Sequence, residues 1–186
     1  MSASLAIIAA YIIGSFPSAY LAGRLIKGED IHCLGDGNAG AANAYHEIGP
    51  LTGITVGLLD AAKGGAAVLV ARGLGMSDHI VLLAGVAAVA GHNWPVFFRF
   101  RGGRGEATAI GVLVALVPNA VLISLGIAAL PLFLSRSVMF ASPFLFISLP
   151  LIAWFFGVGS VLITYSIALA CLVGFTHFLT TRKRPA

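Results

Sequence analysis

Charge is what this sequence has least of. Of its 186 residues, 10% are Asp, Glu, Lys or Arg, whereas 59% are hydrophobic and the mean hydropathy is +0.98. Soluble domains carry about 25% charged residues, so this chain has too few charges to cover a surface exposed to water. Apolar runs recur from end to end without an internal repeat. The composition predicts an integral membrane protein that forms one domain over residues 1–186.

Cysteines and early basic residues are scarce as well. The two cysteines, Cys33 and Cys171, fall in a predicted polar loop and a predicted span without a CxxC pair, so we expect neither a disulfide nor a metal site. The net charge of +4 is spread over short loops, which excludes the continuous basic stripe of a nucleic-acid-binding protein. No Lys or Arg precedes the apolar run from Leu5, so the N-terminus does not resemble a signal peptide and predicts a first span that starts outside.

The apolar runs predict about seven membrane segments. A spanning helix needs about 20 mainly apolar residues. The run 107–134 would reach about 42 Å as one helix at 1.5 Å per residue, which exceeds the hydrocarbon core of about 30 Å. Pro118 disfavours helix at the residue before it, so we divide this run in two. The predicted segments are residues 3–23, 51–70, 79–98, 107–117, 119–134, 138–156 and 159–179.

The basic residues indicate the orientation of these segments. With seven segments and the N-terminus outside, nine of the 11 Lys and Arg residues face the cytoplasm. With six segments, Arg136 and the basic tail would lie outside, against the positive-inside rule. The sequence therefore predicts an all-α polytopic bundle with a cytoplasmic C-terminus. The nine residues are Arg24, Lys27, Arg99, Arg101, Arg104, Arg136, Arg182, Lys183 and Arg184.

Two glycine-rich loops, residues 34–49 and 100–111, are predicted to face the cytoplasm, and each leads into a helix. Helix N-termini present unpaired N–H groups, and glycines let the backbone approach an anion. Arg104 adds a planar fork of donors that suits phosphate. The loop lacks the spacing of a Walker motif. These features predict a phosphate site, with ordinary topology-setting turns as the alternative.

Ionisable side chains inside the predicted spans need partners. Asp60 and Lys63 lie three residues apart on one helix face, and we expect them to pair because charges within a span are costly. They either neutralise each other or anchor the polar loops. The stretch 13–23, "IGSFPSAYLAG", interrupts the first span and predicts a kink or a cavity lining. Three histidines come near the same membrane face, as site groups or helix-end hydrogen bonders: His46, His92 and His177.

Four motifs occur in a family-specific order: "GSFPSAYLAGRL", "GDGNAGAANA", "LLDAAKGGAAV" and "GHNWPVFFRFRGGRGEAT". With them the chain resembles the bacterial membrane acyltransferases that move a fatty acyl group from acyl phosphate to the 1-hydroxyl of glycerol 3-phosphate. The resemblance implies a seven-helix enzyme of the cell inner (cytoplasmic) membrane with its active site at the cytoplasmic face. Its implied partners are acyl phosphate, glycerol 3-phosphate and the lipid bilayer. It implies no cofactor, no nucleic acid and no obligate protein partner.

The resemblance also implies site residues. Arg104 would be the main charge donor, and His92 and His177 are candidates to orient the alcohol or to move its proton. A substrate phosphate is the alternative acceptor of that proton. Ser142 either contributes to the site or packs a helix. The substrate-binding residues expected on this basis are Asp36, Gly37, Asn38, Gly40, Asn43, His46, Gly102, Gly103, Gly105, Thr108 and Ser142.

Five positions depart from the family pattern. Asp36 and Glu106 would repel phosphate unless they are protonated or paired with an arginine. The departures are Asp36 for serine, His46 for arginine, Arg104 for lysine, Glu106 for a small apolar residue and Thr180 for asparagine.

Acyl transfer to glycerol 3-phosphate is the leading hypothesis for the function. The alternatives are a divergent paralogue that acylates another phosphorylated alcohol or only binds anionic lipid, and a small anion transporter with broken helices.

Overall fold

The computed structural model describes residues 2–181, which contain helices and connecting segments but no strand. Within these residues, six helices are long and apolar enough to cross a membrane, and one shorter apolar helix accompanies them. The prediction of an all-helical membrane bundle with about seven segments is confirmed. The tail residues Arg182, Lys183 and Arg184, which the sequence assigned to the cytoplasm, lie outside the described residues.

The helices follow the predicted segments closely. The first segment is broken into α1 (Ala3–Gly14), α2 (Ser18–Ala22) and one π-helical turn (Gly23–Lys27). A short 3-10 turn (Ile31–Cys33) and α3 (Ala41–Glu47) come next, and α3 lies where the sequence predicted only a loop. The remaining helices are α4 (Pro50–Gly73), α5 (Asp78–Asn93), the 3-10 turn Val96–Phe98, α6 (Glu106–Leu116), α7 (Pro118–Ser135), α8 (Val138–Phe155) and α9 (Ser160–Thr181).

Pro118 divides the long apolar run, as predicted. α6 ends at Leu116, and Val117 takes a non-helical conformation with φ −139° and ψ 58° before Pro118 opens α7 as its first residue. This position suits proline, because the N–H that proline lacks has no partner inside the first helical turn. The division separates the short α6 from the longer α7. Counted as two segments, they bring the total to seven and not six.

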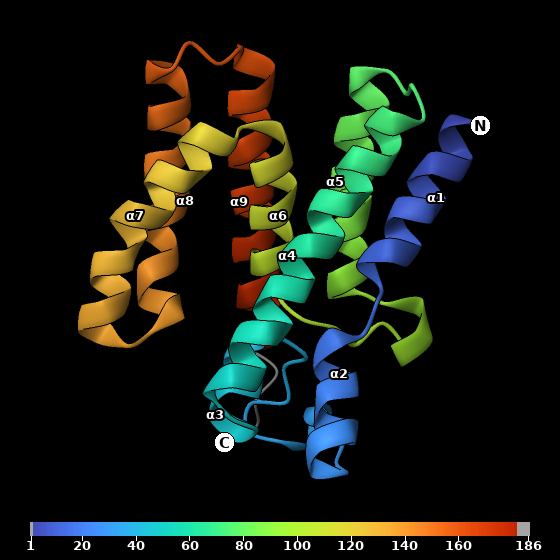
Figure 1. The fold of residues 1–186 in the computed structure, drawn as a ribbon, viewed down its shortest axis with the longest axis vertical. Helices are drawn as coiled ribbons and strands as arrows, with labels where there is room; N and C mark the ends of the chain where they lie inside the picture. Colours follow the sequence, from blue (N-terminus) through green and yellow to red (C-terminus); the bar gives the residue numbers. More distant parts are fainter. Residues whose placement is uncertain (1, 182–186) are drawn as a thin grey trace.

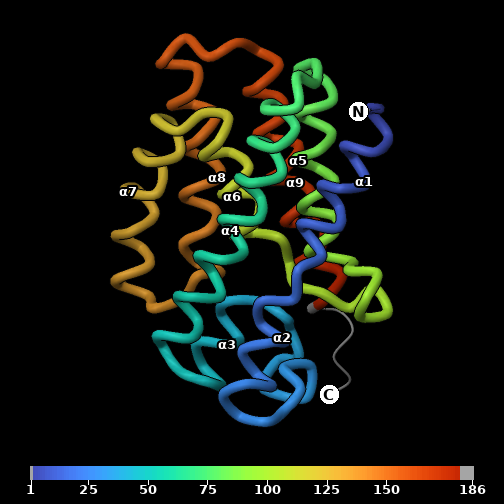
Figure 2. Tube along the Cα trace, turned by 45° about the vertical axis from the view of Figure 1, so that its right-hand side comes forward, coloured from blue at the N-terminus to red at the C-terminus, as the bar shows by residue number. Residues whose placement is uncertain are grey.

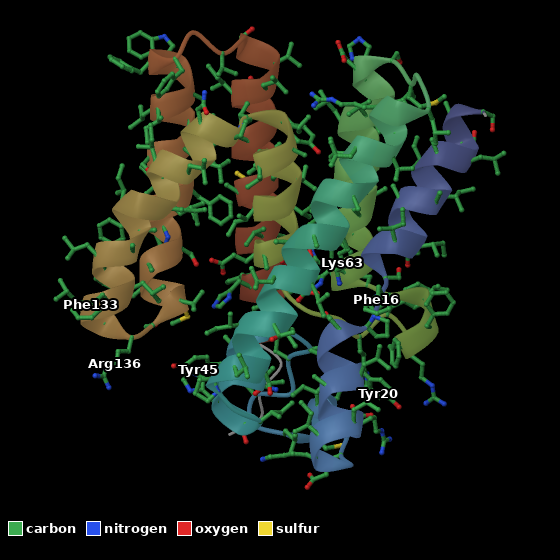
Figure 3. The ribbon with its side chains drawn as sticks, viewed as in Figure 1. Phe16, Tyr20, Tyr45, Lys63, Phe133 and Arg136 are labelled. Carbon is green, nitrogen blue, oxygen red and sulfur yellow. The ribbon has the colours of Figure 1, made fainter. Side chains whose placement is uncertain are left out.

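The two polar segments, 28–49 and 94–105, lie at the same end of the bundle, which we call the loop end (Figures 1 and 2). The N-terminus lies at the opposite end from the last residues of α9, as an odd number of crossings requires (Figure 1). Arg136, between α7 and α8, also lies at the loop end (Figure 3). This clustering agrees with the predicted charge distribution, and the orientation of the loop end toward the cytoplasm stays a prediction.

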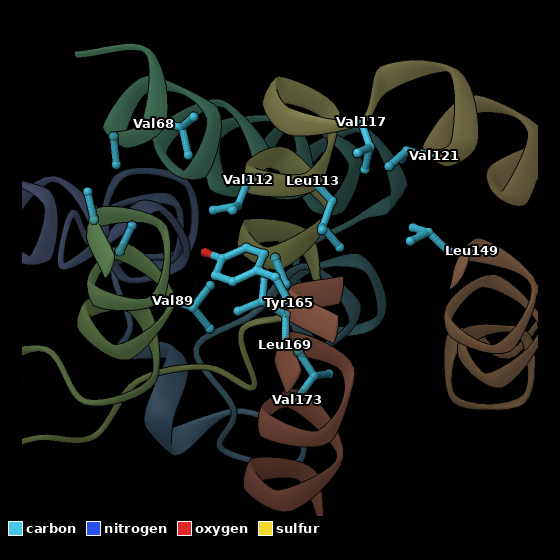
Figure 4. Packing of buried hydrophobic residues seen from close by; sticks show 14 of the residues in the cluster. Val68, Val89, Val112, Leu113, Val117, Val121, Leu149, Tyr165, Leu169 and Val173 are labelled. Atoms are coloured by element: carbon cyan, nitrogen blue, oxygen red, sulfur yellow. The ribbon is translucent and has the colours of Figure 1, made fainter. Parts of the chain in front are cut away.

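Small residues set the spacing of the helices. A side chain at Gly111 of α6 would overlap the backbone of Ala61 in α4, and one at Gly14 of α1 would overlap the backbone of Ala88 in α5. Close backbone approach supplies the packing that the hydrophobic effect does not supply between helices in lipid. Valines and leucines of α4, α5, α6 and α9 fill the centre (Figure 4), whereas many large apolar side chains point outward. The packed helices therefore hold the two polar segments on a fixed base.

Candidate active site

A polar cavity of about 450 Å³ opens at the loop end. Three parts of the chain line it: the segment around Asp36, the end of α5 with the segment after it, and the last turns of α9. Its polar side chains are His32, Asp36, Asn38, Asn93, Arg101, Arg104, Thr176 and Thr180. The cavity therefore joins both glycine-rich loops, which lie about 65 residues apart in the sequence and meet only in the fold.

Arg104 links the three parts of this lining. Its Nη2 donates to Oδ2 of Asp36 at 2.9 Å, and its Nε donates to Oγ1 of Thr180 at 3.2 Å. Its backbone carbonyl accepts a hydrogen bond from Oγ1 of Thr176 at 2.9 Å. The side chains of Arg104 and Asp36 are 18% and 24% exposed, so the pair remains open to the cavity. Asp36 and Thr180 therefore fix the orientation of the guanidinium that an anion would contact in the cavity.

Asn43 shapes the first loop from within. Its Nδ2 donates to the carbonyls of Leu34 and Asn38 at 3.0 and 3.1 Å, and its Oδ1 accepts from the backbone N–H of Asp36 at 3.1 Å. Asp36 in turn accepts from the backbone N–H of Asn38 at 3.0 Å through Oδ1. Gly37, between these two residues, has a φ of +68°. These bonds make Asn43 a scaffold for the residues that line the cavity, and the predicted contact of Asn43 with substrate stays a prediction.

The glycines of the second loop allow it to lie against the end of α5. The backbone N–H of Gly103 donates to the carbonyl of His92 at 3.1 Å, and a Cβ at Gly103 would collide with the His92 ring. A Cβ at Gly102 would collide with the same carbonyl. Gly105 has a φ of +81° and opens α6, and a Cβ there would collide with the side-chain amide of Asn93. The predicted helix start at Glu106 is confirmed, so the N–H groups of the α6 N-terminus lie next to Arg104 in the chain.

A buried charged cluster supports both loops from below. Nζ of Lys63 lies 2.8 Å from Oδ1 of Asp60, which confirms the predicted pair, and Nδ1 of His92 lies 3.5 Å from the same oxygen. Ser18 of α2 also donates its hydroxyl to Asp60. Lys63 donates to the backbone carbonyl of Phe16 at 2.9 Å, and both residues are labelled in Figure 3. The break in the first span thus exposes a carbonyl that the ion pair needs, and it lines a small cleft beside His92.

Eight of the expected site residues lie outside the cavity lining that residues 2–181 form: Gly40, Asn43, His46, His92, Gly105, Thr108, Ser142 and His177. Nε2 of His177 lies 3.1 Å from Sδ of Met139, between α9 and α8. His46 is exposed on α3, and Thr108 is buried between α6 and α4. Ser142 donates its hydroxyl to Glu106. Their roles in substrate binding stay predictions, and the bond from Ser142 directs the Glu106 carboxylate toward α8.

His32 and Asn93 line the cavity but were not singled out by the sequence. The ring of His32 bonds through Nδ1 to Oδ1 of Asp30 at 2.8 Å and through Nε2 to the carbonyl of Arg101 at 3.0 Å, which ties the two loops together. Burial raises the pKa of Asp30, whereas hydrogen bonds from the backbone and ring of His32 lower it. The lowering outweighs the effect of burial, so the pKa of Asp30 lies below its usual value. Asn93 follows His92 at the end of α5. The only sequence feature that could have indicated Asn93 as a site residue is its amide at the end of an apolar helix.

A multi-pass helical bundle with an arginine-bearing polar cavity at one end is the architecture of an integral membrane enzyme that acts on anionic substrates at the membrane surface. A family model described as glycerol-3-phosphate acyltransferase matches residues 4–183. The relative glycerol-3-phosphate acyltransferase 4 of Dehalococcoides mccartyi is 45% identical over 177 residues, covering 95% of this chain and 96% of its own. A Synechococcus glycerol-3-phosphate acyltransferase is 37% identical, over 95% and 88% of the two chains.

Solved structures agree with the sequence relatives. The crystal structure of PlsY (YgiH), an integral membrane glycerol 3-phosphate acyltransferase, in its glycerol 3-phosphate form superposes with a TM-score of 0.87 at 33% identity, covering 98% of this chain and 92% of that one. Its lysophosphatidic acid form gives a TM-score of 0.84 at 33% identity, over 99% and 95% of the chains. The chain described here belongs to the glycerol-3-phosphate acyltransferase family. The family predicted from the four motifs is confirmed, as is a multi-pass integral membrane protein.

Proposed function

We propose that this protein transfers a fatty acyl group from acyl phosphate to the 1-hydroxyl of glycerol 3-phosphate and so makes lysophosphatidic acid for phospholipid biosynthesis. The family relationship supports the reaction type, and the solved relative's glycerol 3-phosphate and lysophosphatidic acid forms support the acceptor and product. The observation that carries the proposal is the polar cavity at the loop end, in which Arg104 presents its guanidinium between Asp36 and Thr180.

The chemistry needs positioning and charge stabilisation more than a protein nucleophile. The acyl carbonyl of the donor is already activated, because phosphate is a good leaving group. The 1-hydroxyl oxygen forms a bond to that carbonyl carbon, the carbon–oxygen bond to phosphate breaks, and the hydroxyl proton ends on the released inorganic phosphate. Holding both substrates in one cavity and stabilising the negative charge that develops are the main contributions expected of the protein.

We infer the residue roles from the geometry of the cavity. Arg104 binds a substrate phosphate, and the backbone between Asp36 and Asn38 forms the opposite wall. His92 acts as a positioning residue, since its carbonyl holds Gly103 and its ring is held by the buried Asp60. A substrate phosphate takes the hydroxyl proton in this scheme, because neither His92 nor His177 lines the larger cavity among the described residues. The acyl chain extends between the helices or into the bilayer.

The cell inner (cytoplasmic) membrane is the location we propose, with the loop end in the cytoplasm and residues 1–186 as one domain. The support is the gathering of basic residues at the loop end, where the positive-inside rule places them. A reporter fused after α9 and one fused before α1 test this topology. Cytoplasmic signal from the first and external signal from the second are expected, and the reverse result would contradict it.

Product formation by the purified protein is the direct test of the reaction. Detergent-solubilised protein with acyl phosphate and glycerol 3-phosphate should form lysophosphatidic acid, detected by mass spectrometry, and Arg104→Ala should lower the rate by at least about 100-fold. Arg136→Ala is the matched control, because it removes the same charge at the exposed α7–α8 turn. Equal losses in both variants, or no product from folded wild-type protein, would contradict the proposal.

A further inference from the structure

Asn93 carries an amide that is buried in the wall of the polar cavity without a hydrogen bond. The residue is 4% exposed and lines the cavity at the end of α5. Among residues 2–181, neither Nδ2 nor Oδ1 of Asn93 has a hydrogen-bond partner. A buried amide with both ends unpaired destabilises a fold, so a side chain of this kind calls for an explanation. An apolar side chain of the same size would fill the position at lower cost.

The surrounding backbone is arranged to make room for this amide. Gly105 leaves the space next to the amide empty, since a Cβ there would collide with Oδ1 of Asn93. The end of α5 is fixed by the bond from the Trp94 N–H to the Ala90 carbonyl at 2.8 Å and by that from Gly103 to His92 at 3.1 Å. Asn93 is therefore held in place by the backbone on both sides while its polar atoms stay unpaired.

The polar groups of the cavity differ in what they can bind. Arg104 offers only donors and the Asp36 carboxylate offers only acceptors, whereas a primary amide offers both. A phosphate oxygen accepts hydrogen bonds and needs only donors, whereas an alcohol both donates and accepts. An unpaired amide in this wall matches a hydroxyl group better than it matches a phosphate.

We propose that Asn93 binds the 2-hydroxyl of glycerol 3-phosphate, the hydroxyl that is not acylated, and thereby determines acceptor specificity. This inference rests on the proposed function. The 2-hydroxyl lies one carbon from the reacting 1-hydroxyl, so the same contact orients the reacting group. Acceptors that lack a hydroxyl at this carbon leave the Asn93 amide unpaired in the complex and are bound less well.

The test compares two acceptors that differ only in this hydroxyl, glycerol 3-phosphate and 3-hydroxypropyl phosphate. Initial rates of phosphate release with a fixed acyl phosphate give kcat/KM for each acceptor. The wild-type protein should prefer glycerol 3-phosphate by roughly ten- to a hundredfold. Asn93→Leu should lower kcat/KM for glycerol 3-phosphate by about the same factor and leave that for 3-hydroxypropyl phosphate within about threefold of wild type. Asn119→Leu, an exposed amide at the start of α7, is the matched control and should change neither.

Thermal unfolding separates this role from a structural one. Asn93→Leu removes two unpaired buried polar atoms, so its apparent Tm should equal or exceed that of wild type. Equal losses of kcat/KM for both acceptors, as expected if the amide binds phosphate or only supports the loop, would overturn the inference. An Asn93→Leu enzyme that keeps the full preference for glycerol 3-phosphate would overturn it too. If the wild-type protein acylates neither acceptor, the proposed function fails and this inference fails with it.

Discussion

Neutralising Asp36 should strengthen phosphate binding. The carboxylate faces the cavity and holds Nη2 of Arg104 at 2.9 Å, so it both occupies a donor and repels an incoming phosphate. Asp36→Asn removes the charge and keeps an oxygen that can accept from the backbone N–H of Asn38, so the turn at Gly37 is retained. The substitution therefore changes the electrostatics of the cavity with little change in its shape.

The size of the effect follows from the strength and exposure of the pair. Hydrogen bonds to charged groups contribute about 1.5–3 kcal/mol. Because the side chains of Arg104 and Asp36 are 18% and 24% exposed, solvent screening places this pair at the lower end, about 1.5 kcal/mol. Since 1.4 kcal/mol corresponds to a factor of ten, relief of this competition should tighten phosphate binding by about tenfold.

Enzyme kinetics at fixed ionic strength measure this change. The KM for glycerol 3-phosphate and the inhibition constant for inorganic phosphate should both fall by the stated factor in Asp36→Asn. Asp78→Asn removes the same charge from the exposed start of α5, at the opposite end of the bundle, and should leave both constants unchanged. A KM and an inhibition constant that stay within twofold of wild type, or that rise, would refute the view that Asp36 competes for Arg104.

Three further predictions concern stability. Asp60→Ala leaves the buried Lys63 charge without its partner, and breaking a buried ion pair costs about 3–5 kcal/mol. The substitution should therefore lower the apparent Tm and the yield of folded protein much more than it raises KM. A normal Tm with a raised KM would contradict this. Gly105→Ala should abolish activity and lower the apparent Tm, because of the φ of +81° and the collision with Asn93; Gly126→Ala, in open space on α7, is the control and should retain full activity. Asp30→Asn should lower the apparent Tm above about pH 4 and lose that effect at lower pH. The reason is that a carboxyl whose pKa is lowered on folding stabilises the fold only while it is ionised. Burial raises the pKa of Asp30, but the hydrogen bonds of His32 outweigh this effect. A Tm difference that grows toward acid pH would be inconsistent with this.

The helices were predictable because their signals are local and redundant. Twenty or so apolar residues, a proline at 118 and the distribution of basic residues define the segments without reference to tertiary contacts. The pairing of Asp60 with Lys63 was predictable for the same reason, since helical spacing alone brings the two charges together. The short helix α3 was not, because its seven residues depend on packing: a Cβ at Gly53 of α4 would collide with Tyr45, which shows how closely the helices approach.

The site was predictable as a region and not as a set of contacts. The glycines and Arg104 indicate phosphate chemistry by residue type, and Gly37, Gly102, Gly103 and Arg104 do line the cavity. His32 and Asn93 lack such a signal, because a histidine or an asparagine at a helix end usually satisfies backbone groups. His46 carried a signal from its loop but lies exposed on α3, since the direction of a side chain depends on the helix that forms there. Side-chain direction is therefore what the sequence could not supply.

Three of the five departures from the family pattern are in direct contact with one another. Asp36, Arg104 and Thr180 form one hydrogen-bonded group, whereas Glu106 is bonded to Ser142 and His46 is exposed. An arginine can join Asp36 and Thr180 through Nη2 and Nε because its donors are spread over a planar fork, and three of its five N–H bonds remain for a ligand. A lysine presents its donors from a single nitrogen, so it could not span the two partners in this way. The acidic residue in the first loop is thus matched by the arginine in the second. A phosphate site that contains Asp36 is for this reason compatible with acyl transfer to a phosphorylated alcohol.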